Sequence, residues 1–343
     1  MTEAGLDLNL LWYVLIGVLL IGYAVLDGFD LGVGTLHIFT KDDHERRILI
    51  NSIGPFWDGN EVWLITGGGA LFAAFPKAYA TAFSGFYLAF MLVLFALILR
   101  AVALEFRSKE PMQWWRRLWD GAFFLGSTLA SLLFGVAVGN LILGLPIDAR
   151  GDFQGSFFTL VSRPYVLLTG ALTVALFTMH GAAFLFYKTA GELQNKVRRW
   201  FWRAYWTFIA LYAVTTVATI FVAPHMFHNF VAFPPAWLAV IVFLAALANT
   251  GRCVHRGKEF GAIMSSAITV AMVVLLFGIG MFPNLVPSLE PGNSLTAYTA
   301  ASSQKTLGIM AIIAALGMPL VLAYTTVIYW IFRGKVKLDK MSY

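Results

Sequence analysis

The stretch Leu26-Asp-Gly-Phe-Asp-Leu-Gly-Val-Gly34 carries two acids inside an apolar segment, and Pro55-Phe-Trp-Asp-Gly-Asn-Glu-Val-Trp-Leu-Ile65 carries two more at the start of the next one. In each stretch the acids are three residues apart, so a helix would present both on one face. A carboxylate at membrane depth is costly and usually faces a cavity, a partner charge or a proton path. These two pairs therefore indicate a membrane helix bundle with a role beyond anchoring.

The composition excludes an ordinary soluble domain. The 343 residues are 59% hydrophobic and 12% charged, whereas soluble domains contain about 25% charged residues. Nine apolar runs approach the roughly 20 residues that a membrane helix needs, so we expect an all-α polytopic membrane protein with a single transmembrane domain. The expected spans are 9–38, 57–75, 79–102, 119–143, 164–187, 203–223, 236–249, 261–281 and 307–332.

The distribution of basic residues predicts the topology. Of the 24 Lys and Arg residues, 20 lie in segments 38–56, 100–118, 188–203, 250–260 and 333–343. By the positive-inside rule this places the N-terminus outside and the C-terminus in the cytoplasm, which requires an odd number of spans. The net charge of +6 therefore reflects topology and predicts no nucleic-acid partner.

The N-terminus and the cysteine content narrow the class further. Residues 1–10 contain two acids and no basic n-region, so we expect no cleavable signal peptide. The single cysteine, Cys253, allows neither a disulfide nor a cysteine-based metal site within the chain, and no metal site is expected.

Several motifs resemble subunit II of the cytochrome bd quinol oxidases. The resemblance is dense to about residue 145, sparse to about residue 280, and returns near the C-terminus. The longest and most specific motif runs from Asn51 to Pro76 and contains Gly-Pro-Phe-Trp-Asp-Gly-Asn-Glu-Val-Trp. The others are Asp27-Gly-Phe-Asp-Leu-Gly-Val-Gly34, Leu99-Arg-Ala-Val-Ala-Leu-Glu-Phe-Arg-Ser-Lys109, Trp119-Asp120 and Ala301-Ser-Ser-Gln-Lys-Thr-Leu307.

The resemblance implies a fold, an activity and a set of partners. The fold would be two four-helix bundles plus one peripheral helix. The complex would oxidise quinol and reduce dioxygen to water in a bacterial or archaeal cytoplasmic membrane. Two b-type haems and one d-type haem would be liganded by subunit I, against which this chain would pack. Small single-span accessory subunits, membrane lipid and a structural quinone beside this chain are further expectations.

The acids form a candidate proton path on the cytoplasmic side. Given the predicted topology, Asp27 lies toward the cytoplasmic end of the first span, Asp58 and Glu61 open the second, and Glu105 lies near the end of the third. The resemblance favours proton transfer, because family members are thought to take up protons through both subunits. Two structural alternatives stay open: Asp58 could cap its helix, and Glu105 could be a solvated interfacial charge.

A second group of residues is expected to be structural. Arg100 follows an apolar run and needs a counter-ion, and a pair with Asp30 would let both remain charged. Asp120 either belongs to the same cluster or favours the start of its helix electrostatically. Trp57 stands beside the second acid pair and is assigned with this group.

The sequence offers one candidate haem ligand and one alternative function. Only His180 lies in mid-span, and a lone histidine on an apolar helix is more often a satisfied core residue than an axial haem ligand. The rival to an oxidase subunit is a proton-coupled secondary transporter, which would also use intramembrane acids. Nine spans do not divide into equal inverted repeats, which disfavours that rival.

Overall fold

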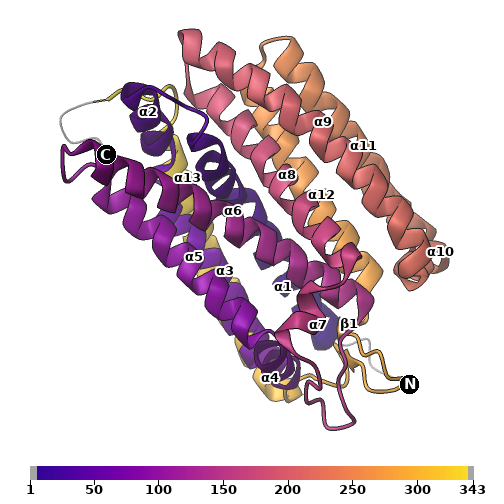
Figure 1. Cartoon of the computed structure of the whole chain (residues 1–343). Coiled ribbons are helices and arrows are strands. Elements are labelled where there is room, and N and C mark those ends of the chain that lie inside the picture. The colour runs from indigo at the N-terminus through magenta and orange to yellow at the C-terminus, as the bar shows by residue number, and fades with distance from the viewer. Residues whose placement is uncertain (1–5, 339–343) are drawn as a thin grey trace.

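The computed structural model describes residues 6–338, and most of this part of the chain is helical (Figure 1). The α-helices are α1 (Leu8–His37), α2 (Asp43–Ile53), α3 (Trp57–Ala74), α4 (Pro76–Gly85), α5 (Tyr87–Phe106), α6 (Gln113–Leu143), α7 (Phe157–Val161), α8 (Pro164–Lys188), α9 (Gly191–Val222), α10 (His228–Ala232), α11 (Trp237–His255), α12 (Glu259–Met281) and α13 (Gln304–Ile331). Two 3₁₀ turns, η1 (Pro224–Phe227) and η2 (Pro234–Ala236), flank α10. The strands β1 (Asn284–Val286) and β2 (Leu295–Thr296) pair in an antiparallel ribbon.

Eight of the described helices are long and apolar enough to cross a membrane, which confirms the prediction of a polytopic α-helical membrane protein. They are α1, α5, α6, α8, α9, α11 together with the preceding 3₁₀ turn, α12 and α13. The helix α3, expected as the second span, has 18 residues and is not among the eight. Its first turns contain Asp58, Asn60 and Glu61, which lower its hydropathy.

Four expected spans differ from the helices, and one of them is 236–249, because α11 continues to His255. The expected span 79–102 is two helices, α4 and α5, that meet at Phe86, and α4 begins with Pro76 in its first turn. Proline there loses no helical hydrogen bond, so it favours a new start. The helices α6 and α9 begin earlier than residues 119 and 203, because their first turns are rich in basic and aromatic residues that an apolar run does not include.

The centre of the molecule is formed by α1 and α8. The inner helix α8 packs against α1, α6, α9 and α12, and α1 also packs against α3. A Cβ atom on Gly32 would lie 1.9 Å from the carbonyl oxygen of Phe177, so only glycine allows α1 and α8 to approach this closely. A Cβ on Gly34 would lie 2.0 Å from Ser127 Oγ on α6. The glycines of the first motif therefore make one face of α1 a packing surface.

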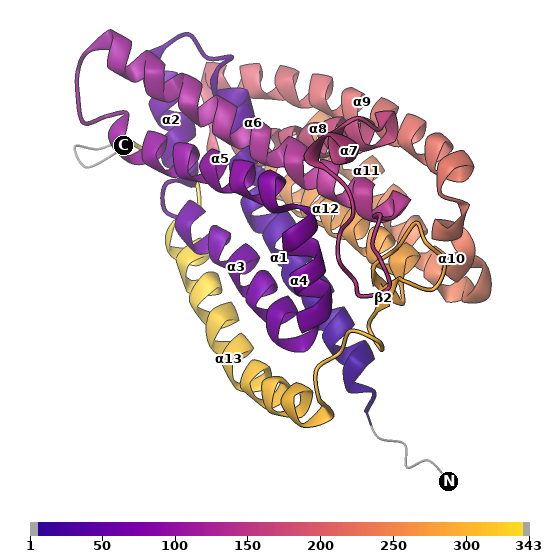
Figure 2. The same ribbon diagram turned by 60° about the horizontal axis from the view of Figure 1, so that its bottom comes forward.

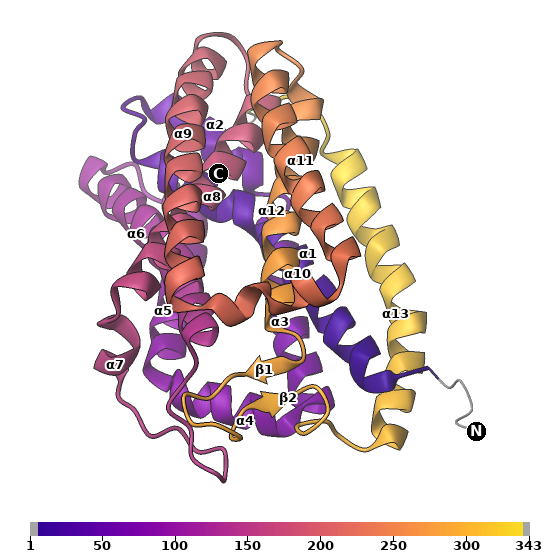
Figure 3. The same ribbon diagram turned by 90° about the vertical axis from the view of Figure 1, so that its right-hand side faces the viewer.

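The last helix, α13, is peripheral. Its main contacts are with α1 and α3, and Figures 2 and 3 show it on one flank with α9 on the other side of the body. Near its start the Trp12 indole donates to the Leu307 carbonyl at 2.9 Å. Near its end Lys188 Nζ donates to the Phe332 carbonyl, and Tyr329 stacks on Phe56 with ring centroids 4.5 Å apart.

The two ends of the helical body differ in charge. In Figure 1 the C-terminus and α2 lie at one end, whereas the N-terminus, α7 and β1 lie at the other. Sixteen of the 24 Lys and Arg residues lie in four segments that connect helices at the C-terminal end, namely 38–56, 100–118, 188–203 and 250–260.

Candidate functional site

A cluster of charged and polar side chains is buried where α1, α3 and α5 meet. We call it the membrane acid cluster, and its members are Asp27, Asp30, Asn60, Glu61 and Arg100. Asp27, Asp30 and Arg100 are all 0% exposed, and the Glu61 side chain is 22% exposed. A protein tolerates buried ionisable groups of this kind only when opposite charges pair with them or when they are in their neutral form.

Local sequence explains how these helices come together. On α1 the glycines pack against α8 and α6, which leaves the acids to face α3 and α5. On α6, a Cβ at Gly126 would lie 2.5 Å from the Ala96 carbonyl oxygen and 3.0 Å from the Arg100 backbone nitrogen. Glycine at this position therefore lets α5 pack close to α6 at the level of the buried arginine.

Arg100 pairs with two carboxylates, and neither is the one that the sequence predicted. Its Nη1 lies 2.8 Å from Asp27 Oδ1, and its Nη2 donates to Glu61 Oε1. Asp30 forms no direct ion pair with Arg100, and Asn60 Nδ2 donates to Asp30 Oδ2 at 2.8 Å instead. Asp27 and Asp30 are three residues apart and about 60° apart around the helix, so a modest rotation of α1 decides which acid meets the guanidinium.

Asn60 connects the acid pair to the last helix. Its amide nitrogen donates to both Asp30 and the Leu26 carbonyl, the latter at 3.1 Å, and its amide oxygen accepts from Tyr329 Oη at 3.1 Å. Neither Asn60 nor Tyr329 was among the candidates from sequence. The signal for Asn60 was present, since it directly precedes Glu61 in the most specific motif.

The membrane acid cluster has more carboxyl groups than cations. Asp27, Asp30 and Glu61 surround the single guanidinium of Arg100. Asp27 Oδ2 and Asp30 Oδ1 are buried, and no hydrogen-bond donor from the described residues reaches either oxygen. Carboxylates this close disfavour full ionisation of the set. The arrangement can therefore hold an exchangeable proton.

A groove between α3 and α13 leads to this cluster. It has a volume of about 490 Å³, and Asp58, Asn60 and Tyr329 line its polar part. Asp58 is exposed in the first turn of α3, and its side chain forms no helix cap, so the capping alternative is wrong. Its charge still suits the start of a helix. The apolar part of the groove is lined by Leu19, Val62, Trp63, Met318, Leu320, Val321 and Ile328.

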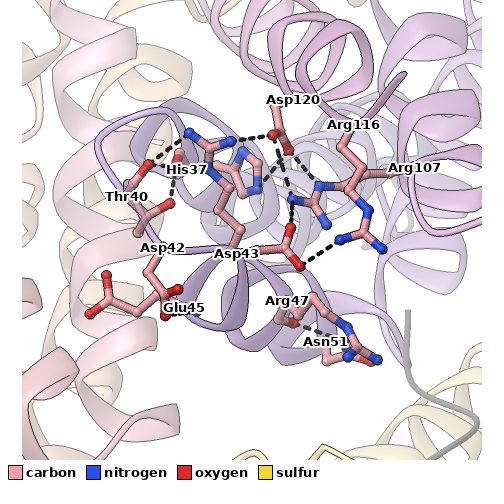
Figure 4. Close-up of polar contacts among 11 residues, drawn as sticks. His37, Thr40, Asp42, Asp43, Glu45, Arg47, Asn51, Arg107, Arg116 and Asp120 are labelled. Carbon is pink, nitrogen blue, oxygen red and sulfur yellow. Dashed lines mark hydrogen bonds and ion pairs between the residues drawn. The ribbon is translucent and has the colours of Figure 1, made fainter. Parts of the chain in front are cut away.

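A second cluster surrounds Asp120, near the C-terminal end of the body (Figure 4). Asp120 is 4% exposed and accepts hydrogen bonds from Arg46 and Arg107, while His37 Nε2 lies 3.4 Å from its Oδ1. It is the eighth residue of α6, so its predicted role at a helix start is wrong. We call this group, together with Asp43, the Asp120 cluster.

The Asp120 cluster holds α2 against the helical body. Arg107, which follows the end of α5, donates from Nη2 to Asp43 Oδ1 at 2.7 Å, and Arg116 Nη1 donates to Asp43 Oδ2 at 3.0 Å. Burial alone would raise the pKa of Asp43, but these two arginines lower it below its usual value. Burial likewise opposes the charge of Arg107, and the bonds to Asp120 and Asp43 raise its pKa overall.

The sequence also missed Arg107. It stands seven residues after Arg100, which is two helical turns along the same face, and it is 1% exposed. That spacing was the available signal. Glu105 lies half-buried on the last turn of α5, and Trp57 is partly buried against the hydrophobic core at the start of α3.

Two histidines, His180 and His37, are buried within the helical body. His180 is 0% exposed, and both ring nitrogens are engaged, Nδ1 with Ser266 Oγ at 2.8 Å and Nε2 with the Val25 carbonyl at 2.9 Å. To ligate a haem iron, His180 would have to give up one of these hydrogen bonds. His37 is enclosed by Asp120 and the ring of Phe123, whose centroid is 5.3 Å away. Residues 6–338 contain no group of three or more His, Cys, Asp or Glu side chains placed to hold a metal ion.

Comparison with known proteins identifies the family. The family model for cytochrome bd terminal oxidase subunit II matches residues 8–332. Cytochrome bd-I ubiquinol oxidase subunit 2 of Escherichia coli (strain K12) is 39% identical and covers 96% of this chain and 95% of its own. Cytochrome bd ubiquinol oxidase subunit 2 of Bacillus subtilis (strain 168) is 36% identical, with 96% and 97% covered.

A solved structure shares the fold. A chain in the structure of bd oxidase from Geobacillus thermodenitrificans superposes with a TM-score of 0.80 at 16% sequence identity, and the match covers 95% of this chain and 99% of that one. The sequence relatives and the family model together confirm the resemblance first seen in the motifs. The chain belongs to the cytochrome bd terminal oxidase subunit II family.

Proposed function

We propose that this chain is the subunit of a quinol-oxidising, dioxygen-reducing membrane complex that supports the haem-bearing partner and supplies part of a cytoplasmic proton path. Its relatives are named as subunit 2 of ubiquinol oxidases, and this family assignment favours the oxidase over a proton-coupled transporter. The observation that carries the proton role is the membrane acid cluster, where three carboxyl groups share one buried guanidinium beside a groove.

The proposed topology has nine crossings, with α3 as the additional one. The helix contacts support two four-helix bundles, α1, α3, α5 and α6 in one and α8, α9, α11 and α12 in the other, with α13 at the periphery. The concentration of basic residues at the C-terminal end supports an outside N-terminus and a cytoplasmic C-terminus. Under this topology the Asp120 cluster lies at the cytoplasmic surface, and the membrane acid cluster lies deeper.

The two b-type haems and the d-type haem belong to subunit I in this proposal. When bound there, haem supplies the redox chemistry of quinol oxidation and dioxygen reduction. The two hydrogen bonds of the His180 ring, to Ser266 and to the Val25 carbonyl, support this assignment. The contribution of this chain is therefore to pack against the partner, exclude water and hold protons.

The proposed proton path begins at Asp58. It is exposed in the groove between α3 and α13, which Asn60 and Tyr329 also line. Beyond Asp58, Tyr329 donates to Asn60, and Asn60 donates to Asp30. Water in the polar part of the groove would complete the chain, since proton transfer needs hydrogen-bond reach at each step. A structural quinone or lipid tail would fit the apolar part of the same groove.

Inside the cluster the proton passes toward the partner. Asp27 and Glu61 are bridged by Arg100, and of these three only Glu61 is partly exposed on the surface of this chain. Glu105 is proposed as a further acid on the cytoplasmic side of the same helix as Arg100.

We propose that subunit I covers the α3 and α5 side of this chain. A charged group open to lipid would be costly, so the exposed edge of Glu61 favours a protein partner there. On α3, Gly68 and Gly69 would allow that partner a close approach, because a Cβ added at either would meet no atom within 4 Å.

The direct test is purification of the membrane complex through an affinity tag on this chain. The expected product is coloured, with haem absorption, a tightly bound larger partner and quinol-dependent oxygen consumption. A colourless chain that is stable without a partner would contradict the proposed function.

A further inference from the structure

A second groove opens on the far side of the helical body from α13. It has a volume of about 510 Å³ and lies among α6, α8, α9 and the residues that follow α1. Figures 2 and 3 show α9 and α13 on opposite sides, so this groove is separate from the groove between α3 and α13. Its lining includes Phe39, Leu132, Val174, Arg203 and Leu211.

The groove exists because α8, which lies between α6 and α9, has small residues at the bottom of the groove. The helix α8 packs against both α6 and α9, and it contributes Ala171 and Ala175 to the groove. Two of the three threonines in the lining have hydroxyl groups that bond to protein. Thr178 Oγ1 donates to the Val174 carbonyl at 2.6 Å, and Thr128 Oγ1 bonds to Thr35 Oγ1 at 3.2 Å. The walls therefore present a largely apolar surface.

One end of this groove is positively charged. Arg203 lines it and is exposed, and Arg199, one helical turn earlier, is also exposed. Neither arginine forms an ion pair with another described residue. Trp200 also lines the groove there, and no carboxylate does. An indole with one apolar and one polar edge suits the headgroup level of a bilayer.

We propose that this groove binds an anionic phospholipid, with the phosphate on Arg199 and Arg203 and one acyl chain between α6 and α9. The charge and the apolar walls are arranged in the order that such a lipid requires. Along α9 the distance from Arg203 to Leu211 is eight residues, or about 12 Å. The groove therefore receives the upper part of an acyl chain, and the rest continues into the bilayer.

The test uses the purified complex in nanodiscs of dioleoylphosphatidylcholine with a trace of phosphatidylglycerol that has a photoactivatable diazirine in one acyl chain. After illumination, labelled peptides are mapped by mass spectrometry. We expect label on the groove-lining parts of α6, α8 and α9. Unlabelled dioleoylphosphatidylglycerol should displace it, and additional dioleoylphosphatidylcholine should not.

Two variants separate charge from shape. Arg203→Gln should lower labelling about five-fold, the effect of one basic residue near an anionic lipid surface. Arg252→Gln is the matched control, because Arg252 is an exposed arginine in the last turn of α11, away from the groove, and it should leave labelling unchanged. Ala171→Phe fills the floor without changing charge and should also lower labelling.

Three outcomes would overturn the proposal. They are label absent from the groove, equal displacement by the phosphatidylcholine competitor, and equal effects of Arg203→Gln and Arg252→Gln. The last result would show that general surface charge, and not the groove, recruits the lipid.

Discussion

Replacing Arg100 with alanine should destabilise the folded protein more than any change to a surface ion pair, since it removes the only cation of the membrane acid cluster. The guanidinium is 0% exposed and contacts both Asp27 and Glu61. Without it, Asp27 is left buried with no cation beside it. Breaking a buried pair by removing one partner costs about 3–5 kcal/mol, a large part of the roughly 5–15 kcal/mol that stabilises a typical folded domain.

The assay is haem content and thermal denaturation of the complex purified through this chain. Arg100→Ala should give low yield, reduced haem absorption and a lower melting temperature. Adding Asp27→Asn to Arg100→Ala should recover part of the loss, because the buried carboxylate is then no longer charged. Arg116→Ala is the control, since its ion pair with Asp43 is partly exposed, with side-chain exposures of 34% and 43%, and exposed pairs contribute about 0–1 kcal/mol. Wild-type haem content and stability in Arg100→Ala would refute the reasoning.

Two further predictions concern packing and pH. Gly32→Ala should destabilise the contact of α1 with α8 by about 1–3 kcal/mol, because the new Cβ would overlap the Phe177 carbonyl, whereas Gly17→Ala on the same helix meets nothing within 4 Å and should be neutral in a melting assay. Asp43 has a lowered pKa, so its ion pairs stabilise the fold above the ordinary pKa of about 3.9 and lose that effect as the pH falls through the lower folded value. Asp43→Asn should therefore lower the melting temperature at neutral pH, and the difference from wild type should disappear in acid; a constant difference across pH would contradict this.

The sequence predicted that Asp27, Asp30, Glu61 and Arg100 lie near one another, but not which pairs they form, nor that Asp120 belongs to a separate cluster. Membrane-length apolar runs and the basic residues at alternate loops placed the acids of α1, α3 and α5 at one depth. The partner of Arg100 depends on the rotation of α1 about its axis, and that rotation is set by the contacts of Gly32 and Gly34 with α8 and α6. Contacts between distant helices of this kind cannot be derived from spacing along one helix.

The Asp120 cluster shows a second limit. Asp43 lies on α2, a short helix in a connection that looked like a charged loop, and its acid and basic residues are locally consistent with a solvated surface. Only the docking of α2 on Arg107 and Arg116 buries one end of this network. The break between α4 and α5 was missed for a related reason, since both helices are apolar and hydropathy alone does not record a turn at Phe86.

Proton uptake by Asp58→Asn after an oxygen pulse, in vesicles containing the purified complex, tests the proton path most directly. Asparagine keeps the shape of Asp58 but cannot titrate. We predict full haem content with oxygen reduction and proton uptake slowed about ten-fold or more. Asp152→Asn, an exposed acid in the loop before α7, should behave as wild type. Normal turnover and normal proton uptake in Asp58→Asn would contradict the account.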